Sequence, residues 1–122
     1  MLVVEDDAPL RELYRSLLRQ AGYTVIAVED GLAALHSIDQ RRPAAVVLDM
    51  ALPRLSGRDV YQELKGRPDT CDIPIVVVSG HDVSDLNEAD FASVLRKPLG
   101  PESLVSAVQK GIARSGRAAG PA

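Results

Sequence analysis

Residues 44–57, AAVVLDMALPRLSG, contain the stretch that decides the fold. The apolar run at 44–48 does not alternate with polar residues, and Asp49 follows it directly. A short, valine-rich run of this kind is typical of a strand that is covered on both faces. Pro53 and Gly57 then mark a loop before the next apolar pattern. We therefore interpret the stretch as a buried strand that ends on an acidic residue and runs into a loop.

Four other segments have the character of strands. Two are clear apolar runs, Leu2–Val4 and Ile73–Val78, and two are weaker candidates, Thr24–Val28 and Ser93–Arg96. With the run at 44–48 they make five strands.

Helical patterns lie between these strands. The clearest has apolar residues at helical spacing from Leu10 to Ala21, and Gly22 supplies a left-handed stop. A second helix is expected after Asp30 as N-cap, ending before Pro43. A third follows Gly57, and the last is entered through Pro101. Strands and helices thus alternate along the chain.

This alternation predicts an α/β protein with a parallel sheet, right-handed crossovers and helices on both faces. The expected architecture is flavodoxin-like and doubly wound, with five strands in the order 2-1-3-4-5. A single domain is expected over residues 1–114. Residues 115–122, SGRAAGPA, have no large apolar side chain and are interpreted as a disordered tail or the start of a linker.

Composition restricts the class of partner. The 122 residues carry a formal net charge of −3, which gives no general attraction to nucleic acid or to an anionic membrane. No apolar run approaches the length of a membrane span, and the chain opens on a strand rather than a signal segment. We therefore expect a cytoplasmic protein without direct nucleic-acid or membrane partners.

Acidic and polar residues directly follow the predicted strands. Glu5 and Asp6 follow the first, Asp49 the third, Ser79 the fourth and Lys97 the fifth. Ligands of open parallel sheets bind beyond the carboxyl ends of the strands, so the topology gathers these residues at one edge. Clustered carboxylates repel each other unless a cation sits among them. Mg²⁺, held by carboxylates, waters and a phosphate, fits such a site.

The same residues also have simpler structural interpretations. An acidic residue after a strand is often a helix N-cap, which is the better explanation of Asp7. A Ser-Gly pair after a strand is often only a turn, and a Lys-Pro pair is often only a loop start. Their convergence at one edge favours a functional site.

With these residues in these positions, the chain resembles the receiver domains of two-component response regulators from Leu2 to about Ile112. The motifs that carry the resemblance are LVVEDD (2–7) with PLR (9–11), VVLDMALPRLSG (46–57), IPIVVVSG (73–80) and RKPL (96–99). The resemblance implies a Mg²⁺- or Mn²⁺-dependent domain that is phosphorylated on an aspartate by a histidine kinase or a histidine phosphotransfer protein. The change of charge would then alter the binding of a downstream partner or output domain.

The resemblance assigns a role to each matching position. Asp49 would be the phospho-acceptor, Asp6 a direct metal ligand, and Glu5 a ligand through a metal-bound water. The backbone carbonyl of Ala51 would complete the metal site. Three further assignments are Ser79 as the switch hydroxyl, Lys97 as the phosphate-pairing cation, and Lys97–Pro98 as a candidate cis peptide bond. Gly57 would permit the sharp entry to the third helix.

Two features depart from the family pattern. Receivers commonly have an aromatic residue three positions before the lysine, where this chain has Val94, so an aromatic rotamer is not expected to report the switch. Residues 80–92 leave room for only about two helical turns, so the fourth helix of the family should be short or irregular. Ala51 and His81 lie two residues after Asp49 and Ser79, where they could tune the lifetime of the phosphoryl group.

Two other functions compete with the switch. One is a phospho-independent interaction module of the same fold, which would have no reason to keep the acid pair together with Asp49, Ser79 and Lys97. The other is a phosphatase with an aspartyl-phosphate intermediate. Such an enzyme usually has a second acid two residues after its nucleophile, where this chain has Ala51.

Overall fold

The computed structural model describes residues 1–80 and 91–115. Strands and helices alternate as predicted from the first strand to the fourth, and the next described element after the fourth strand is the fifth strand. The elements are β1 (Leu2–Val4), α1 (Ala8–Gln20), β2 (Ile26–Val28), α2 (Gly31–Gln40), β3 (Val46–Asp49), α3 (Gly57–Lys65), β4 (Ile75–Ser79), β5 (Ser93–Arg96) and α4 (Pro101–Ser115). The label α4 thus belongs to the C-terminal helix.

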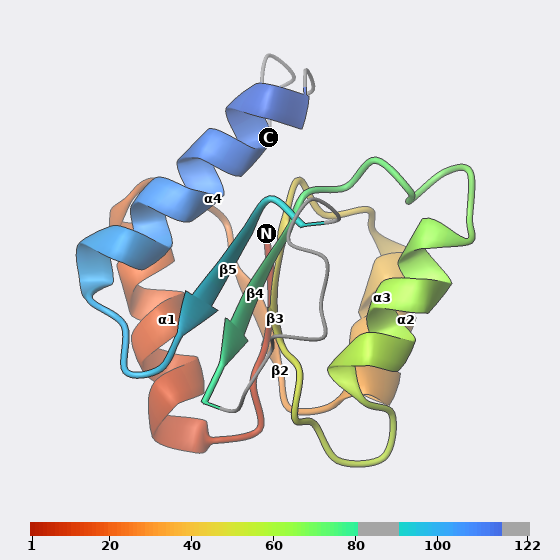
Figure 1. The fold of residues 1–122 in the computed structure, drawn as a ribbon, viewed down its shortest axis with the longest axis horizontal. Coiled ribbons are helices and arrows are strands. Elements are labelled where there is room, and N and C mark those ends of the chain that lie inside the picture. Colours follow the sequence, from red (N-terminus) through yellow and green to blue (C-terminus); the bar gives the residue numbers. More distant parts are fainter. Residues whose placement is uncertain (81–90, 116–122) are drawn as a thin grey trace.

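The five strands form one parallel sheet in the order β2-β1-β3-β4-β5, which confirms the predicted topology. Among residues 1–80 and 91–115, two helices cover each face. Helices α1 and α4 lie on one side of the sheet, and α2 and α3 lie on the other (Figure 1). This is the doubly wound, flavodoxin-like arrangement, in which the carboxyl ends of all strands meet at one edge.

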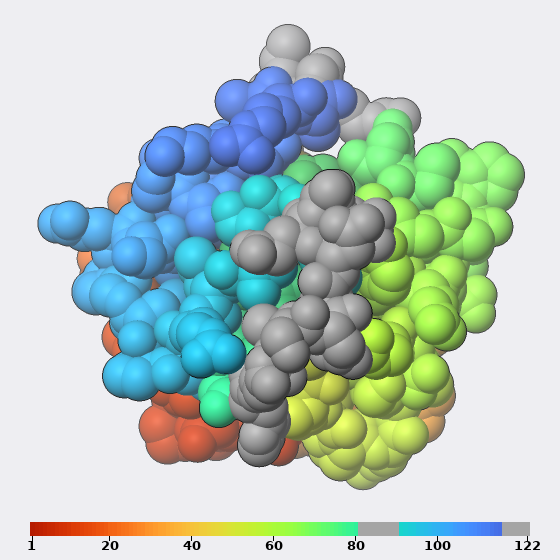
Figure 2. Space-filling view, in the orientation of Figure 1, coloured from red at the N-terminus to blue at the C-terminus, as the bar shows by residue number. Residues whose placement is uncertain are grey.

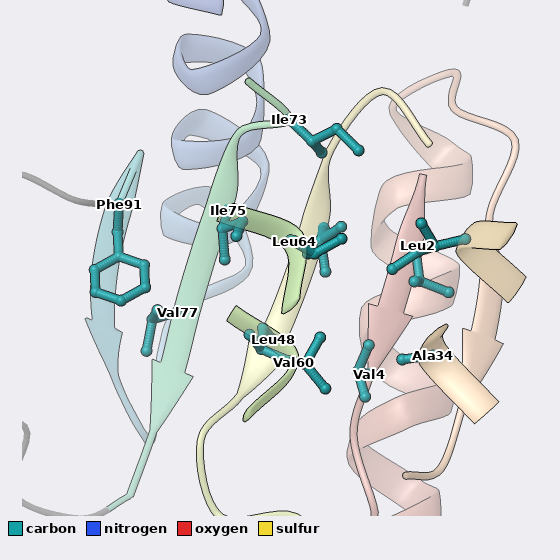
Figure 3. Close-up of a cluster of buried hydrophobic side chains, with 12 residues drawn as sticks. Leu2, Val4, Ala34, Leu48, Val60, Leu64, Ile73, Ile75, Val77 and Phe91 are labelled. Carbon is teal, nitrogen blue, oxygen red and sulfur yellow. The ribbon is translucent and has the colours of Figure 1, made fainter. Parts of the chain in front are cut away.

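The core consists of two layers because successive side chains of a strand point to opposite faces. Val3, Val47 and Val76 pack with α1 and α4. Val4, Leu48 and Val77 pack on the other face, under Val60 and Leu64 of α3 and Ala34 of α2 (Figure 3). Both layers need apolar residues, which explains why the central strands are apolar without alternation.

Side-chain caps fix the starts of the first three helices. Asp7 caps α1 by accepting a hydrogen bond from the amide of Leu10 at 3.1 Å, as the sequence predicts. Asp30 caps α2 through the amide of Ala33 at 2.8 Å. Ser56 and Asp59 form a reciprocal capping box at α3. These caps determine where each loop at the carboxyl edge ends and each helix begins.

The two edge strands differ in how well the sequence predicted them. Strand β2 is shorter than the expected Thr24–Val28, because it pairs with β1 alone and β1 has three residues. Strand β5 has the expected bounds. It is visible beside α4 on the face shown in Figure 2.

Three sequence predictions concern the limits of the described chain. The predicted short fourth helix and His81 fall on residues 81–90, outside the described residues. Helix α4 extends to Ser115, whose hydroxyl donates to the Ile112 carbonyl. The rest of the predicted tail, residues 116–122, also lies outside the described part. No helix within residues 1–80 and 91–115 has the length and apolar character needed to cross a membrane.

Candidate functional site

The site lies at the carboxyl edge of the sheet, toward which the strand arrows point at the bottom of Figure 1. Glu5 directly follows β1, and its amide donates to the Val28 carbonyl of β2 at 3.1 Å. Asp49 and Ser79 are the last residues of β3 and β4. Lys97 directly follows β5, and its amide donates to the Ser79 carbonyl at 2.9 Å. Sheet pairing therefore fixes the backbone of all four residues.

Three carboxyl groups converge at this edge. Glu5, Asp6 and Asp49 each offer an oxygen, and these oxygens lie within 4.8 Å of one another. Glu5 and Asp49 are buried, whereas Asp6 is exposed. The cluster thus has a buried floor formed by two carboxylates and an open side formed by the third.

Lys97 joins the two buried carboxylates. Its Nζ atom lies 2.7 Å from Oε1 of Glu5 and 3.3 Å from Oδ2 of Asp49. The Lys97 side chain is itself mostly buried, with 19% of its surface exposed. The ammonium group therefore acts as an internal counter-ion for a pair of acids that would otherwise repel each other.

Burial and neighbouring charges shift the affinities for protons. Burial raises the pKa of Glu5 to about 7, although Lys97 and the amide of Asp7 act in the opposite direction. Burial also disfavours the charged form of Lys97, but hydrogen bonding and attraction to the two carboxylates outweigh it, and the pKa of Lys97 is raised. Lys97 therefore keeps its positive charge at neutral pH.

Backbone amides orient the two buried acids. The Asp7 amide donates to Oε2 of Glu5 at 3.2 Å, and the Ala51 amide donates to Oδ1 of Asp49 at 3.0 Å. Gly57 serves the site by close approach: a Cβ atom there would overlap the Asp49 carbonyl oxygen and lie 2.6 Å from Cα of Met50. The sequence analysis expected Gly57 to permit a sharp entry to α3. The close contact with the backbone of Asp49 and Met50 is the physical reason why a glycine is needed there.

The remaining predicted residues are placed as follows. Ser79 is buried at the end of β4, next to the strand that carries Asp49. The Lys97–Pro98 peptide bond is cis. Val94 is half-buried and packs against the core layer below α2 and α3. Ala51 is exposed at the start of the β3–α3 loop, and His81 lies outside the described residues.

Two residues near the site were not singled out from the sequence. Arg11, on the first turns of α1, donates from Nη1 to the Glu5 carbonyl at 3.0 Å and to the Asp6 carbonyl at 3.4 Å. Tyr14 is buried one turn further along, and burial raises its pKa, with Lys97, Glu5 and Asp49 near enough to contribute. Arg11 belongs to the PLR motif (9–11) of the resemblance, but no role was assigned to it, and Tyr14 had no signal beyond its position on the predicted helix.

The donor set indicates the kind of ion that the site can hold. All three converging groups are carboxylates, which are hard oxygen ligands suited to Mg²⁺ or Mn²⁺ rather than to Zn²⁺. Within the described residues, the buried Glu5 Oε1 atom has the Lys97 ammonium group, at 2.7 Å, as its one partner. The residues therefore fit a divalent cation, with Asp6 on the side open to solvent.

A doubly wound fold with three acids, a serine and a lysine at its carboxyl edge defines a receiver, and comparison with known families agrees. The model of the response regulator receiver domain matches residues 1–109. The chain therefore belongs to the response regulator receiver domain family, the signalling domains of two-component systems.

Curated relatives are response regulators. The response regulator MprA of Mycobacterium sp. (strain KMS) is 37% identical over 126 aligned residues, which cover 99% of this chain and 54% of the relative. MprA of Mycobacterium tuberculosis (strain H37Rv) is 40% identical over 111 residues, 87% of this chain and 47% of the relative. The chain thus spans about half the length of these relatives.

Solved structures have the same fold. A sensor protein from Polaromonas sp. JS666 superposes with a TM-score of 0.86 at 26% identity, covering 93% of this chain and 95% of that one. The receiver domain of NtrX from Brucella abortus gives a TM-score of 0.82 at 26% identity, covering 92% and 97% of the two chains. The relatives therefore include a separately crystallised receiver domain and response regulators about twice as long as the matched region.

Proposed function

We propose that this chain is a phosphorylation switch in which Asp49 accepts a phosphoryl group from a histidine kinase or a histidine phosphotransfer protein. The observation that carries the proposal is the placement of Lys97, whose Nζ lies within 3.3 Å of both buried carboxylates at the sheet edge. A lysine held beside the proposed nucleophile is positioned to pair with the oxygens of a phosphoryl group. Membership of the receiver family supports the same chemistry.

The proposed transfer is a single displacement. An Asp49 carboxylate oxygen attacks phosphorus, the phosphorus–nitrogen bond of the donor's phosphohistidine breaks, and the imidazole leaves with the bonding electrons. The product is an aspartyl phosphate. Mg²⁺, held by Asp6, Asp49, the Ala51 carbonyl and, through water, Glu5, would neutralise the phosphoryl oxygens during the transfer.

The residues of the chain supply positioning. The Ala51 amide holds one oxygen of Asp49 at 3.0 Å and leaves the other toward Lys97. After transfer, Lys97 would pair with the phosphoryl group, and the Ser79 hydroxyl would close on it. The added negative charge would bias the adjoining loops and alter partner binding. We assign this activity to the cytoplasm, where a kinase partner would act.

Phosphorylation of the isolated chain tests the proposal. Incubation with Mg²⁺ and acetyl phosphate should add the mass of one phosphoryl group, and a beryllofluoride mimic should shift NMR signals around Asp49. Both effects should vanish in Asp49→Asn and in excess EDTA. An unmodified wild-type protein, or a modification that persists in Asp49→Asn, would refute the switch. The first result would favour a phospho-independent interaction module.

A further inference from the structure

The loop between β3 and α3, residues 50–56, follows the proposed phospho-acceptor and carries Ala51. Its inner part is tied to Asp49 by the Ala51 amide and to α3 by the hydrogen bond from the Gly57 amide to the Met50 carbonyl at 3.3 Å. Its outer part packs against the amino-terminal turn of α2.

Asp30 makes the first contact between α2 and this loop. The residue is 3% exposed, and its two carboxylate oxygens have different partners. Oδ1 accepts the hydrogen bond that caps α2, from the Ala33 amide at 2.8 Å. Oδ2 lies 3.3 Å from Nη1 of Arg54, in the middle of the loop. One buried side chain therefore fixes the helix end and the loop together.

Arg54 and Gly31 show that the loop is shaped to this contact. Arg54 has a φ of 64°, a left-handed conformation that is uncommon for a residue other than glycine. Gly31, the first residue of α2, faces Leu55 so closely that a Cβ atom at position 31 would overlap the Leu55 carbonyl oxygen and lie 2.8 Å from its Cβ. The backbones of loop and helix are in direct contact.

We propose that Asp30 is a positioning residue of the metal site, acting through Arg54 on the loop that presents Ala51. The inference rests on the proposed function, because it concerns the affinity of that site for Mg²⁺. Asp30 is not a member of the acid cluster of Glu5, Asp6 and Asp49, and its side chain bonds Ala33 and Arg54. Its effect is on the geometry of the loop, and therefore on how well the Ala51 carbonyl meets the cation.

Stability is a poor measure of this role. Arg54 is 65% exposed, and ion pairs with an exposed partner contribute little to the free energy of unfolding. The informative measurements are the Mg²⁺ dissociation constant from calorimetry and the hydrogen exchange of amides 50–56. Asn is as good an N-cap as Asp, so Asp30→Asn removes the charge that faces Arg54 and keeps the cap of α2.

We expect Asp30→Asn and Arg54→Gln each to weaken Mg²⁺ binding roughly tenfold, the lower end of the loss expected when a group that orients a metal ligand is removed. Loop amides should exchange faster in both variants. The double variant should be no weaker than either single one, because both remove the same contact. Arg54→Lys keeps the charge and the left-handed backbone, so it should restore most of the affinity.

Arg42 provides a matched control. It pairs with Asp72 at 2.7 Å and bonds the Asp69 carbonyl, and these partners lie in the turn before β4, away from the carboxyl edge. Arg42→Gln should therefore leave Mg²⁺ affinity and loop exchange unchanged. Wild-type affinity in both Asp30→Asn and Arg54→Gln would overturn the inference alone, as would an equal loss in Arg42→Gln. A wild-type chain that does not bind Mg²⁺ would overturn the proposed function, and this inference with it.

Discussion

At the residue scale, the buried acid pair and its lysine dominate the behaviour of the site. Lys97 keeps its charge, while burial gives Glu5 an unusually high pKa of about 7. The proton occupancy of Glu5 therefore changes near neutral pH. Glu5 lies at the buried floor of the site, so a change in its charge alters the electrostatic interactions of both Asp49 and Lys97.

This shifted pKa predicts a pH-dependent stability in protein freed of divalent cations. The pKa of Glu5 is raised from 4.5 in the unfolded chain to about 7 in the fold, so folding takes up a proton between these values. The contribution is fully present below pH 4.5 and is lost as the pH rises through 7. The free energy of unfolding, measured by urea titration in EDTA across this window, should therefore fall with rising pH.

Substitution isolates the contribution of Glu5. Glu5→Gln cannot ionise, so the slope of stability against pH should become flatter over the same window. Glu102→Gln removes an exposed carboxylate from the first turn of α4 and is the control, for which the wild-type slope should remain. An unchanged slope in Glu5→Gln would show that burial of this carboxyl group does not control the titration.

The sequence revealed the members of the site but not their contacts. Glu5, Asp6, Asp49, Ser79 and Lys97 could be selected because each follows a recognisable strand and parallel strands end at a common edge. The bond from Arg11 to the Glu5 carbonyl and the pair of Asp30 with Arg54 depend on how a helix meets a loop in space. Contacts of this kind cannot be predicted from residue spacing in a single sequence.

At the element scale, the start of α1 separates two adjacent acids into different roles. Asp7 caps the helix, whereas Asp6 belongs to the carboxylate cluster. Asp7→Ala should lower the free energy of unfolding by about 1 kcal/mol, the usual value of an N-cap. It should leave Mg²⁺ affinity nearly unchanged, because the amide of residue 7 that bonds Glu5 is retained.

Asp6→Ala should show the reverse pattern. The side chain is exposed, so its loss should change stability by less than about 0.5 kcal/mol. Mg²⁺ binding, followed by calorimetry, should be strongly weakened. If instead Asp7→Ala weakened Mg²⁺ binding and Asp6→Ala lowered the free energy of unfolding, the roles assigned to the two acids would have to be exchanged.

The length of an element proved harder to predict than its existence. Strand β2 was expected from Thr24 but begins at Ile26, because a strand lasts only as long as its neighbour and β1 has three residues. By contrast, the capping residues Asp7 and Asp30 act locally, so the starts of α1 and α2 could be predicted well. Local capping signals therefore located the helix starts, whereas the start of β2 depended on the length of its partner strand.

At the scale of the whole molecule, two core layers lie on the two faces of the sheet. Helices α1 and α4 cover one face of the sheet and α2 and α3 cover the other (Figure 1). The buried side chains of α4 end with Ile112. The folded unit therefore needs the chain at least as far as the last turn of α4.

Removal of residues 116–122 tests the predicted domain boundary. This segment has no large apolar side chain, so we expect its deletion to change the free energy of unfolding by less than about 0.5 kcal/mol. Urea titrations of the full and shortened chains measure the difference. As a positive control, Ile112→Ala should cost roughly 2–5 kcal/mol because it opens the core below α4. A comparable loss on deletion of 116–122 would place the boundary beyond Ser115.

Lys97 and the acid cluster together also set the net charge of the site. The three carboxylates and the one ammonium group of the site carry a net charge of −2 when all three acids are ionised. One divalent cation neutralises this charge, whereas one sodium or potassium ion neutralises half of it. The charge of the ion should therefore matter more for binding than its radius. Potassium chloride should be unable to substitute for a low concentration of Mg²⁺ at the site.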